Sequence, residues 1–311
     1  MAFLYALPGA VAEGLIWGLM AIGVYISYKI LDIADLTVDG SICTGACVCA
    51  VLLSMGVPAW ASVLIALLAG ALTGIVTGLL HTLLGIPSIL AGILTQLMLY
   101  SVNLLILSGK SLMPIDPRAN ALLVHMSNNN GSILSLLIIV VSTIFLLYEF
   151  FYTEVGLTLK STGDNPDMSR AQGVDVDRNK VIGLAISNGI VAMAGALLAQ
   201  YKGSANINDG RGAIVIGLAA IFIGLSVSLK IKPNFVVSLI GVTCGGIVYY
   251  IVYNFVILMG LKTDYLKMLS AIIVALFLGI PYLKTKYFTK QKDLHPSDLI
   301  NKAKSGGDGH A

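Results

Sequence analysis

The chain has 311 residues, of which 57% are hydrophobic and only 11% are charged, with a formal net charge of +3. A soluble domain carries about 25% charged residues to cover its surface, so this composition argues against a soluble globular protein. The small positive charge does not indicate nucleic-acid binding, because the lysines and arginines lie between apolar segments and form no basic face with interleaved aromatic residues.

The charged residues leave long apolar runs between them, such as the stretch from Ser41 to Gly109, which contains no Asp, Glu, Lys or Arg. A helix needs about 20 apolar residues to cross a bilayer core, and every backbone polar group there must be satisfied internally. The runs do not alternate apolar and polar residues as the strands of a membrane barrel do. We therefore predict an all-α polytopic membrane protein with about nine spans (8–10), at 9–30, 40–56, 58–83, 87–107, 131–150, 180–200, 212–229, 234–259 and 264–283.

The connection between the first two predicted spans carries three aspartates, Asp32, Asp35 and Asp39. Asp39 directly precedes the span 40–56, where a carboxylate can cap a helix and interact favourably with its dipole. We therefore expect Asp39 to be the N-cap of that helix, with substrate contact as the alternative. The span itself is short and rich in small residues, so it either crosses fully or forms a re-entrant piece.

Amide side chains inside the later spans are the other candidates for a substrate pathway, because polar groups at membrane depth are costly and are often functional. Their alternative role is to hydrogen-bond one helix to another. Asn206 and Asn208 stand before the short segment 212–229 and could meet arriving substrate. The pathway candidates are Asp35, Asp39, Gln96, Asn103, Asn188, Asn206 and Asn208.

Glycines recur on one face of the predicted span 58–83, at positions 70, 74 and 78. This small-x-x-x-small spacing allows a second helix to approach closely. The four cysteines, at 43, 47, 49 and 244, also fall within apolar segments, and we interpret them as small packing residues rather than metal ligands.

The longest charged segment, residues 153–180, has the signals of a short helix. Asn165 can cap it, Pro166 suits its first turn and Gly173 suits its end, so a helix over 166–172 is predicted. A helix of two turns is not stable alone. It must therefore be held by the bundle or by a partner, and we prefer a docking element over a solvated loop.

The distribution of Lys and Arg predicts the orientation in the membrane, because cytoplasmic loops carry the excess. With nine crossings, one side holds 13 of these residues and the other holds 6. The segment 153–180 and the C-terminal tail are therefore expected in the cytoplasm. The N-terminus is expected outside, provided that the span 40–56 crosses. Residues 1–285 form the membrane domain, and the polar tail 286–311 is expected to be disordered.

A weak internal repeat is also present. In each copy, a Tyr-Lys pair is followed by a polar stretch, an Asp-Gly pair, a short small-residue span and a proline. The copies begin five spans apart and so enter the membrane from opposite sides, which is typical of transporters with inverted repeats. Chance similarity is the alternative. The matched positions are Tyr28-Lys29, Asp39-Gly40 and Pro58 in the first copy, and Tyr201-Lys202, Asp209-Gly210 and Pro233 in the second.

Three motifs carry a resemblance to a known family. The segment 163–174, with Gly163, Asn165, Ala171 and Gly173, resembles the G-x-N-x-x-x-A-x-x-x-G-[IV]-type loop of permease subunits of ATP-binding-cassette importers in the branched-chain amino acid and ribose permease family. The segment 34–41 is similar to the D-L-[ST]-V-x-S motif of the sugar branch, although Asp39 and Gly40 stand where that branch usually has one glycine. The segment 85–91 resembles the G-[IV]-P-x-[FI]-[IL]-[AV] start of a core span.

The resemblance covers roughly residues 10 to 285 and looks closest to the subgroup tied to tryptophan or tyrosine uptake. It implies a type II importer-like permease in the bacterial cytoplasmic membrane that pairs with a second permease subunit. A homodimer is expected, with a heterodimer as the alternative. Its other partners would be a cytoplasmic ATPase dimer, an extracytoplasmic substrate-binding protein and membrane lipid. By the same resemblance, the ATPase-coupling residues are Gly163, Asp164, Asn165, Pro166, Met168, Arg170, Ala171 and Gly173.

The expected function is therefore ATP-driven import of a small solute, such as an amino acid and in particular an aromatic one, by alternating access. The chain has no G-x-x-x-x-G-K-[ST] loop, so ATP and Mg²⁺ are expected on a separate ATPase chain and no cofactor or metal on this one. The alternative is a secondary transporter driven by an ion gradient, which would need carboxylates or lysines within its spans. An intramembrane enzyme is disfavoured, because no catalytic pair of His, Asp or Glu is visible.

Overall fold

The computed structural model describes residues 2–116, 122–126, 129–228 and 234–258, together with five residues from 268 to 279. The chain divides into two units, residues 1–274 and 275–311. Every helix and strand named below belongs to the first unit. The predicted ninth span, 264–283, lies mostly outside the described residues, and the predicted tail, 286–311, lies wholly outside them.

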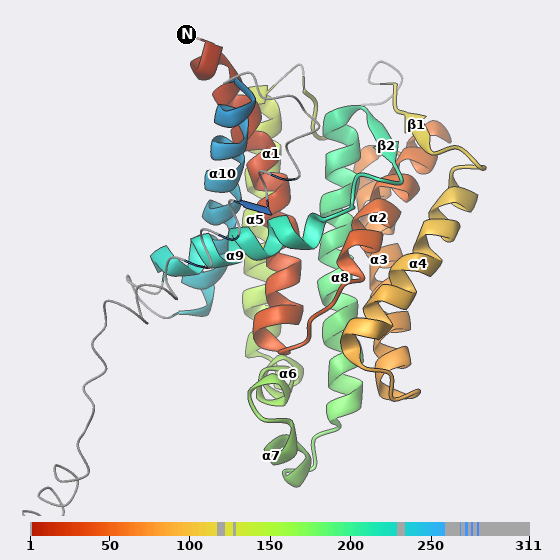
Figure 1. Ribbon diagram of the computed structural model, residues 1–311, viewed down its shortest axis with the longest axis vertical. Helices are drawn as coiled ribbons and strands as arrows, with labels where there is room; N and C mark the ends of the chain where they lie inside the picture. Colours follow the sequence, from red (N-terminus) through yellow and green to blue (C-terminus); the bar gives the residue numbers. More distant parts are fainter. Residues whose placement is uncertain are drawn as a thin grey trace, which may run out of the picture. The chain divides into compact units, whose positions relative to one another are not determined.

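The first unit is a bundle of helices with one small pair of strands (Figure 1). Strand β1 (Leu112–Pro114) pairs antiparallel with β2 (Ser204–Asn206), a pairing that the sequence analysis did not predict. The helices are α1 (Ala2–Tyr25) with its π-helical continuation η1 (Ile26–Ile30), α2 (Val38–Ser54), α3 (Ala59–Thr82), α4 (Ser88–Ile106), α5 (Asn129–Tyr152), α6 (Glu154–Asp164), α7 (Pro166–Ala171), α8 (Val176–Lys202), α9 (Ala213–Ser228) and α10 (Phe235–Leu258).

Six of these helices are long and apolar enough to cross a membrane, and α2 and α9 are shorter apolar helices. These eight helices correspond in order to the first eight predicted spans, so the prediction of an all-α polytopic membrane protein is confirmed for this part of the chain. Helix α2 is the segment 40–56, whose full crossing was left open, and α9 is the other short segment.

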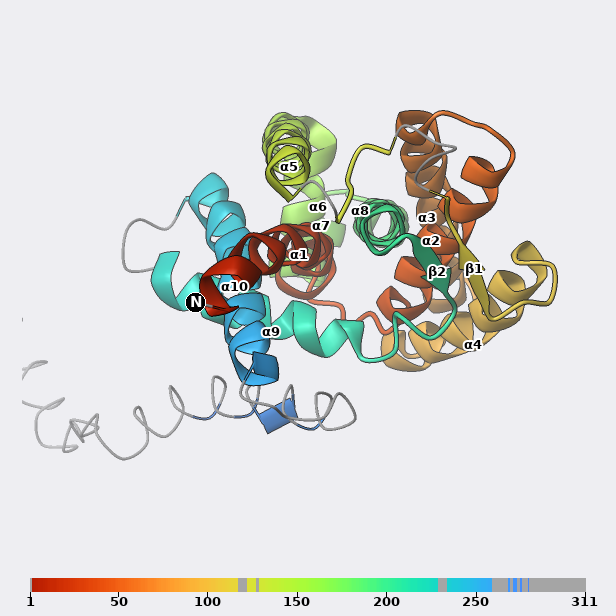
Figure 2. The same ribbon diagram turned by 90° about the horizontal axis from the view of Figure 1, so that it is seen from above.

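Helices α1 and α8 lie side by side near the centre of the bundle and run in opposite directions (Figures 1 and 2). Helix α8 packs against α1, α2 and α3, whereas α1 packs against α8, α9 and α10. Helix α5 packs against α1, and α4 covers α2 and α3. The N-terminus of α1 lies at the opposite end of the bundle from α6 and α7 (Figure 1).

Close helix approach depends on glycines. A Cβ atom at Gly74 would overlap the backbone oxygen of Leu184, and one at Gly70 would overlap that of Asn188, so the predicted glycine face of α3 does pack against α8. Helix α2 crosses α8 at similarly short range, because a Cβ at Gly45 would overlap the backbone of Ala192. These contacts join helix backbones directly, which only a residue without a Cβ permits.

The outer faces of α3, α4 and α5 expose large apolar side chains, including Leu72 at 63%, Leu105 at 78% and Leu146 at 63%. Soluble monomers rarely expose contiguous apolar surface on this scale. The exposed faces therefore fit contact with lipid or with neighbouring membrane helices.

Candidate functional site

A hydrogen-bonded polar network lies inside the bundle, around the connection between η1 and α2. The Asp35 carboxylate accepts from the backbone N–H of Thr37 at 2.9 Å and from Asn188 Nδ2 at 2.6 Å. Asn188 Oδ1 in turn accepts from Ser41 Oγ at 2.6 Å, and Ser41 bonds Thr73 at 2.7 Å. The network therefore links the connection before α2 to α2, α3 and α8.

A second branch of hydroxyl groups extends this network to α4. Thr37 Oγ1 lies 2.7 Å from Thr77 Oγ1, and Thr77 bonds Thr95 at 3.0 Å. All three threonines are buried. Buried polar groups that satisfy one another fix the relative positions of the elements that carry them. The interrupted segment between α1 and α2 is thus held by α3, α4 and α8 together.

Asp39 has a different role from the one predicted. It is the second residue of α2, whose N-cap is Thr37, and so it does not cap that helix. Its carboxylate instead accepts from the backbone N–H groups of Gly212, at 2.8 Å, and Ile214, at 2.9 Å, at the start of α9. The carboxylate therefore caps the other short helix, where the helix dipole favours an anion.

A cavity of about 430 Å³ lies between the start of α2, the second half of α4 and the turn that precedes α9. It brings together three of the seven predicted pathway residues, Asp39, Gln96 and Asn103. Two further polar residues, Tyr100 and Arg211, complete its polar lining, with the Arg211 guanidinium 6.0 Å from the Tyr100 ring centre. The remaining lining residues are Gly40, Cys43, Leu97 and Ile207.

The other four predicted pathway residues do not line this cavity. Asp35 and Asn188 are hydrogen-bonded to each other in the interior network. Asn206 uses its Oδ1 to accept from the backbone N–H of Asn208 at 2.9 Å, so both residues shape the turn beside the cavity. The amide and carboxylate residue types could be found in the sequence, but the direction in which each side chain points could not.

Cys43 has a role beyond the packing expected for it, because it lines the cavity and bonds the turn at 207–211. Its Sγ lies 3.3 Å from the carbonyl oxygen of Ile207 and accepts from the backbone N–H of Gly210 at 3.1 Å. Tyr100 and Cys43 are thus site residues that sequence reasoning missed. The only signal for Tyr100 was its position one turn after Gln96 on the same helix face.

At the opposite end of the bundle, the predicted short helix is present as α7. Asn165 caps it by accepting from the backbone N–H of Met168 at 3.0 Å, and Pro166 occupies its first turn. The helix ends in a Schellman motif, because Gly173 has φ +82° and the N–H groups of residues 173 and 174 bond the carbonyls of Arg170 and Ser169. Both ends of α7 are therefore fixed by local hydrogen bonds.

Helix α7 is held on one side and open on the other. Ser169 is buried and donates to Ser161 Oγ of α6 at 3.3 Å, whereas Met168 is 60% exposed. The preceding helix α6, which was not predicted as a separate element, packs on the end of η1, since a Cβ at Gly163 would overlap the Ile30 carbonyl. Helix α6 thus connects α7 to the end of α1.

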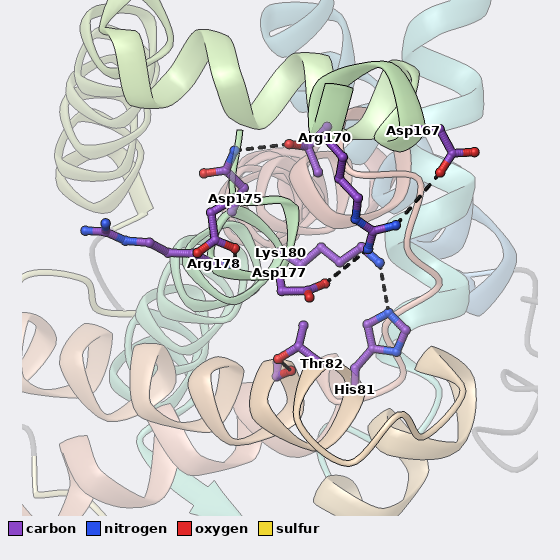
Figure 3. Close-up of polar contacts among 11 residues, drawn as sticks. His81, Thr82, Asp167, Arg170, Asp175, Asp177, Arg178 and Lys180 are labelled. Carbon is purple, nitrogen blue, oxygen red and sulfur yellow. Dashed lines mark hydrogen bonds and ion pairs between the residues drawn. The ribbon is translucent and has the colours of Figure 1, made fainter. Parts of the chain in front are cut away.

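Charged groups surround the junction of α7, α8 and the turn after α3 (Figure 3). Arg170 lies between Asp167, at 3.8 Å, and Asp177, at 3.5 Å. Lys180 Nζ lies 3.4 Å from Nε2 of His81, whose Nδ1 lies 2.8 Å from the carbonyl oxygen of Ile86. The two Arg170 pairs are exposed, and exposed ion pairs contribute little to stability.

The chain is similar to known membrane permeases over most of its length. Residues 9–287 match the family model described as branched-chain amino acid transport system / permease component. The tyrosine transport system permease protein of Clostridioides difficile (strain R20291) is 38% identical over 269 residues, covering 86% of this chain and 88% of that protein.

Two further relatives extend the likeness. An uncharacterised protein of Rickettsia prowazekii (strain Madrid E) is 31% identical over 277 residues, covering 88% of this chain and 96% of that protein. The autoinducer 2 import system permease protein LsrC of Yersinia pseudotuberculosis (serotype IB, strain PB1/+) is 31% identical over 189 residues, covering 60% of this chain and 52% of that protein. No solved structure matches the chain.

Proposed function

Because the chain belongs to the family of branched-chain amino acid transport system permease components, we propose that it is the membrane-spanning half of an ATP-driven importer for an amino acid. It is a multi-pass permease of the bacterial inner membrane for a small solute. The name of the tyrosine permease relative supports an aromatic amino acid as cargo. ATP hydrolysis would occur on a separate chain, and an extracytoplasmic binding protein would deliver the substrate.

The arrangement of the helices supports alternating access through two inverted repeats. Each proposed repeat runs long–short–long, α1–α2–α3 in the first and α8–α9–α10 in the second. Helix α8 contacts all three helices of the first set, α1 contacts all three of the second, and α1 and α8 are antiparallel. In transporters of this kind, one repeat rocks against the other around a site near their interface. Two such permease chains would form the complete pathway.

The observation that carries the proposal is α7, a six-residue helix fixed at both ends and exposed at the end of the bundle assigned to the cytoplasm. A helix so short needs outside support. Its exposed methionine offers an apolar anchor to a partner, as interface cores commonly do. We propose that the loop 153–180 is the coupling element, with Gly163, Asp164, Asn165, Pro166, Met168, Arg170, Ala171 and Gly173 shaping or presenting its surface to the ATPase.

Replacing Met168 with glutamate tests the docking role. The carboxylate would have to enter an apolar contact without a partner, and this is costly. We expect the ATPase to copurify at about a tenth of the parent level or less, with a matching loss of uptake. The control is Met126→Glu, since Met126 is 63% exposed and lies in the connection before α5 at the other end of the bundle. Equal copurification and uptake in both variants would exclude α7 as the docking helix.

One observation favours a second candidate, a secondary transporter. Asp35 is a fully buried carboxylate, and within the described residues it forms no ion pair with a lysine or arginine. Such a group could carry a proton. We expect instead that proteoliposomes holding the complete complex transport amino acid only when ATP is supplied on the α7 side. Uptake driven by an imposed proton gradient in the absence of ATP would contradict the importer and favour this alternative.

A further inference from the structure

The cavity between α2, α4 and the turn at 207–211 has two polar groups whose bonding needs the described part of the protein does not fully meet, the Asn103 Oδ1 acceptor and the Arg211 cation. Asn103 is 1% exposed, and its Oδ1 accepts no hydrogen bond from any described group. A buried acceptor without a donor is destabilising, and native structures contain few of them. Because Asn103 lines the cavity, this acceptor fits a hydrogen-bond donor on a ligand bound there.

Arg211, at the mouth of the same cavity, is a cation with N–H donors and therefore fits a negatively charged acceptor. Its guanidinium lies over the Tyr100 ring and forms no ion pair within the described residues. Both Arg211 and Tyr100 are exposed, whereas Asn103 is buried, so the cavity runs from the surface into the bundle. Guanidinium groups bind carboxylates through paired N–H donors. The cavity thus offers an anion contact outside and an acceptor inside.

The charge of Asp39 decides which kind of ligand fits. Its two oxygens are already bonded by the start of α9, but the carboxylate still lines the cavity and favours a nearby cation. A simple anion would leave Asn103 without a donor and would meet Asp39. A simple cation would meet Arg211. A small zwitterion satisfies both ends, and Leu97, Ile207 and the Tyr100 ring offer apolar surface to its side chain.

We propose that this cavity is a substrate site within the permease, in which Arg211 binds the α-carboxylate of an amino acid and Asn103 binds its α-ammonium group. Its volume, about 430 Å³, lies within the range of about 300–1,000 Å³ usual for small-ligand sites. The turn at 207–211, which lines the cavity, follows β2 directly, and the β1–β2 pair lies at the end of the bundle away from α7 (Figure 1). A binding protein would deliver cargo from that end. This inference rests on the proposed importer function and adds the contacts that select the cargo.

The test is direct binding of radiolabelled L-tyrosine to the complex of permease and copurified ATPase in nanodiscs, with no binding protein present. We expect Arg211→Gln and Asn103→Leu to weaken binding about tenfold or more, because each removes a charge-assisted contact. Asn103→Asp keeps an acceptor and should bind within about threefold of the parent. The control is Lys110→Gln, since Lys110 is an exposed cation after α4 that does not line the cavity.

Competition with two analogues separates the two contacts. Tyramine lacks the carboxylate, so it should compete with labelled L-tyrosine for the parent site less well than unlabelled L-tyrosine does. The affinity for tyramine should be no lower in Arg211→Gln than in the parent. The amine-free analogue, 3-(4-hydroxyphenyl)propionate, should also bind the parent less tightly than L-tyrosine. Its affinity should be no lower in Asn103→Leu than in the parent. Arg211 is exposed, so its variant tests the site even where Asn103→Leu reduces folding.

The outcomes distinguish this inference from the proposed function. Parent-like binding by both Arg211→Gln and Asn103→Leu, with the ATPase still attached, overturns the substrate site and leaves the importer intact. Failure of the parent to bind L-tyrosine, L-tryptophan or L-leucine at millimolar concentration overturns it as well. Met168→Glu should retain binding while losing the ATPase, and failure of the parent to copurify any ATPase would count against the importer itself.

Discussion

Replacing Asn188 with leucine is expected to destabilise the folded permease by about 3 kcal/mol or more. Asn188 is fully buried, donates to the Asp35 carboxylate at 2.6 Å and accepts from Ser41 at 2.6 Å. Hydrogen bonds to charged groups are worth about 1.5–3 kcal/mol each, and leaving a buried charge unpaired adds a desolvation cost. Thermal unfolding of the purified protein should show a midpoint lower by roughly 5–10 °C.

The matched control is Asn254→Leu. Asn254 also lies in an apolar helix, but among the described residues its side chain bonds only the Tyr250 carbonyl of its own helix, at 3.3 Å. It should unfold close to the parent. Adding Asp35→Asn to Asn188→Leu should recover part of the loss, since a neutral amide costs less to bury than a carboxylate. Equal midpoints for Asn188→Leu and Asn254→Leu would mean that the network contributes nothing to stability.

The segments that span the membrane could be predicted from the sequence because hydropathy and charge are local properties. Eight predicted spans coincide with eight helices, including the two short ones, α2 and α9. The cap of α7 was predictable for the same reason, since Asn165, Pro166 and Gly173 act on their immediate neighbours. Such signals depend on a few adjacent residues and need no knowledge of the tertiary structure.

The polar side chains were harder to assign because their partners are far away in the sequence. Asp39 precedes an apolar run and has the pattern of its cap, yet its carboxylate bonds residues 212 and 214 on another helix. Asp35 sits in a stretch with the composition of a solvated connection, yet Asn188 and Thr37 enclose it. The contact between residue 35, in the connection before α2, and residue 188, in α8, cannot be inferred from the sequence pattern of either segment.

The same reasoning separates Asn103 from Asn188, two amides within apolar spans that look alike in the sequence. Asn188 faces the packed centre and its hydrogen bonds are made by α2 and the connection before it. Asn103 faces a cavity and its Oδ1 stays unbonded within the described chain. One amide therefore supports the fold, and the other is available to a ligand. The two amides differ only in what their side chains face in the folded bundle, and helix packing determines this.

Gly45→Ala is expected to be among the most disruptive single-methyl changes in the bundle. A Cβ at position 45 would overlap the backbone oxygen and carbon of Ala192, and these atoms belong to the central helix α8 and cannot rotate away. Overpacking of a core costs about 1–3 kcal/mol even where side chains can adjust. Here α2 must move off α8, which would disturb the Asp35–Asn188–Ser41 network and the cavity beside Asp39 together. Folded protein recovered after solubilisation should fall sharply.

Gly189→Ala is the matched control, because it makes the same change on α8 at a looser contact. Its nearest neighbours would be the Leu67 carbonyl oxygen at 3.2 Å and Ala71 at 3.6 Å. Alanine is the better helix former by about 1 kcal/mol, so this variant should unfold at or slightly above the parent temperature. Since both variants gain the same helix propensity, the difference between their unfolding midpoints measures the α2–α8 contact itself. If the two midpoints agree, α2 does not approach α8 through Gly45, and the geometry of the cavity would have to be revised.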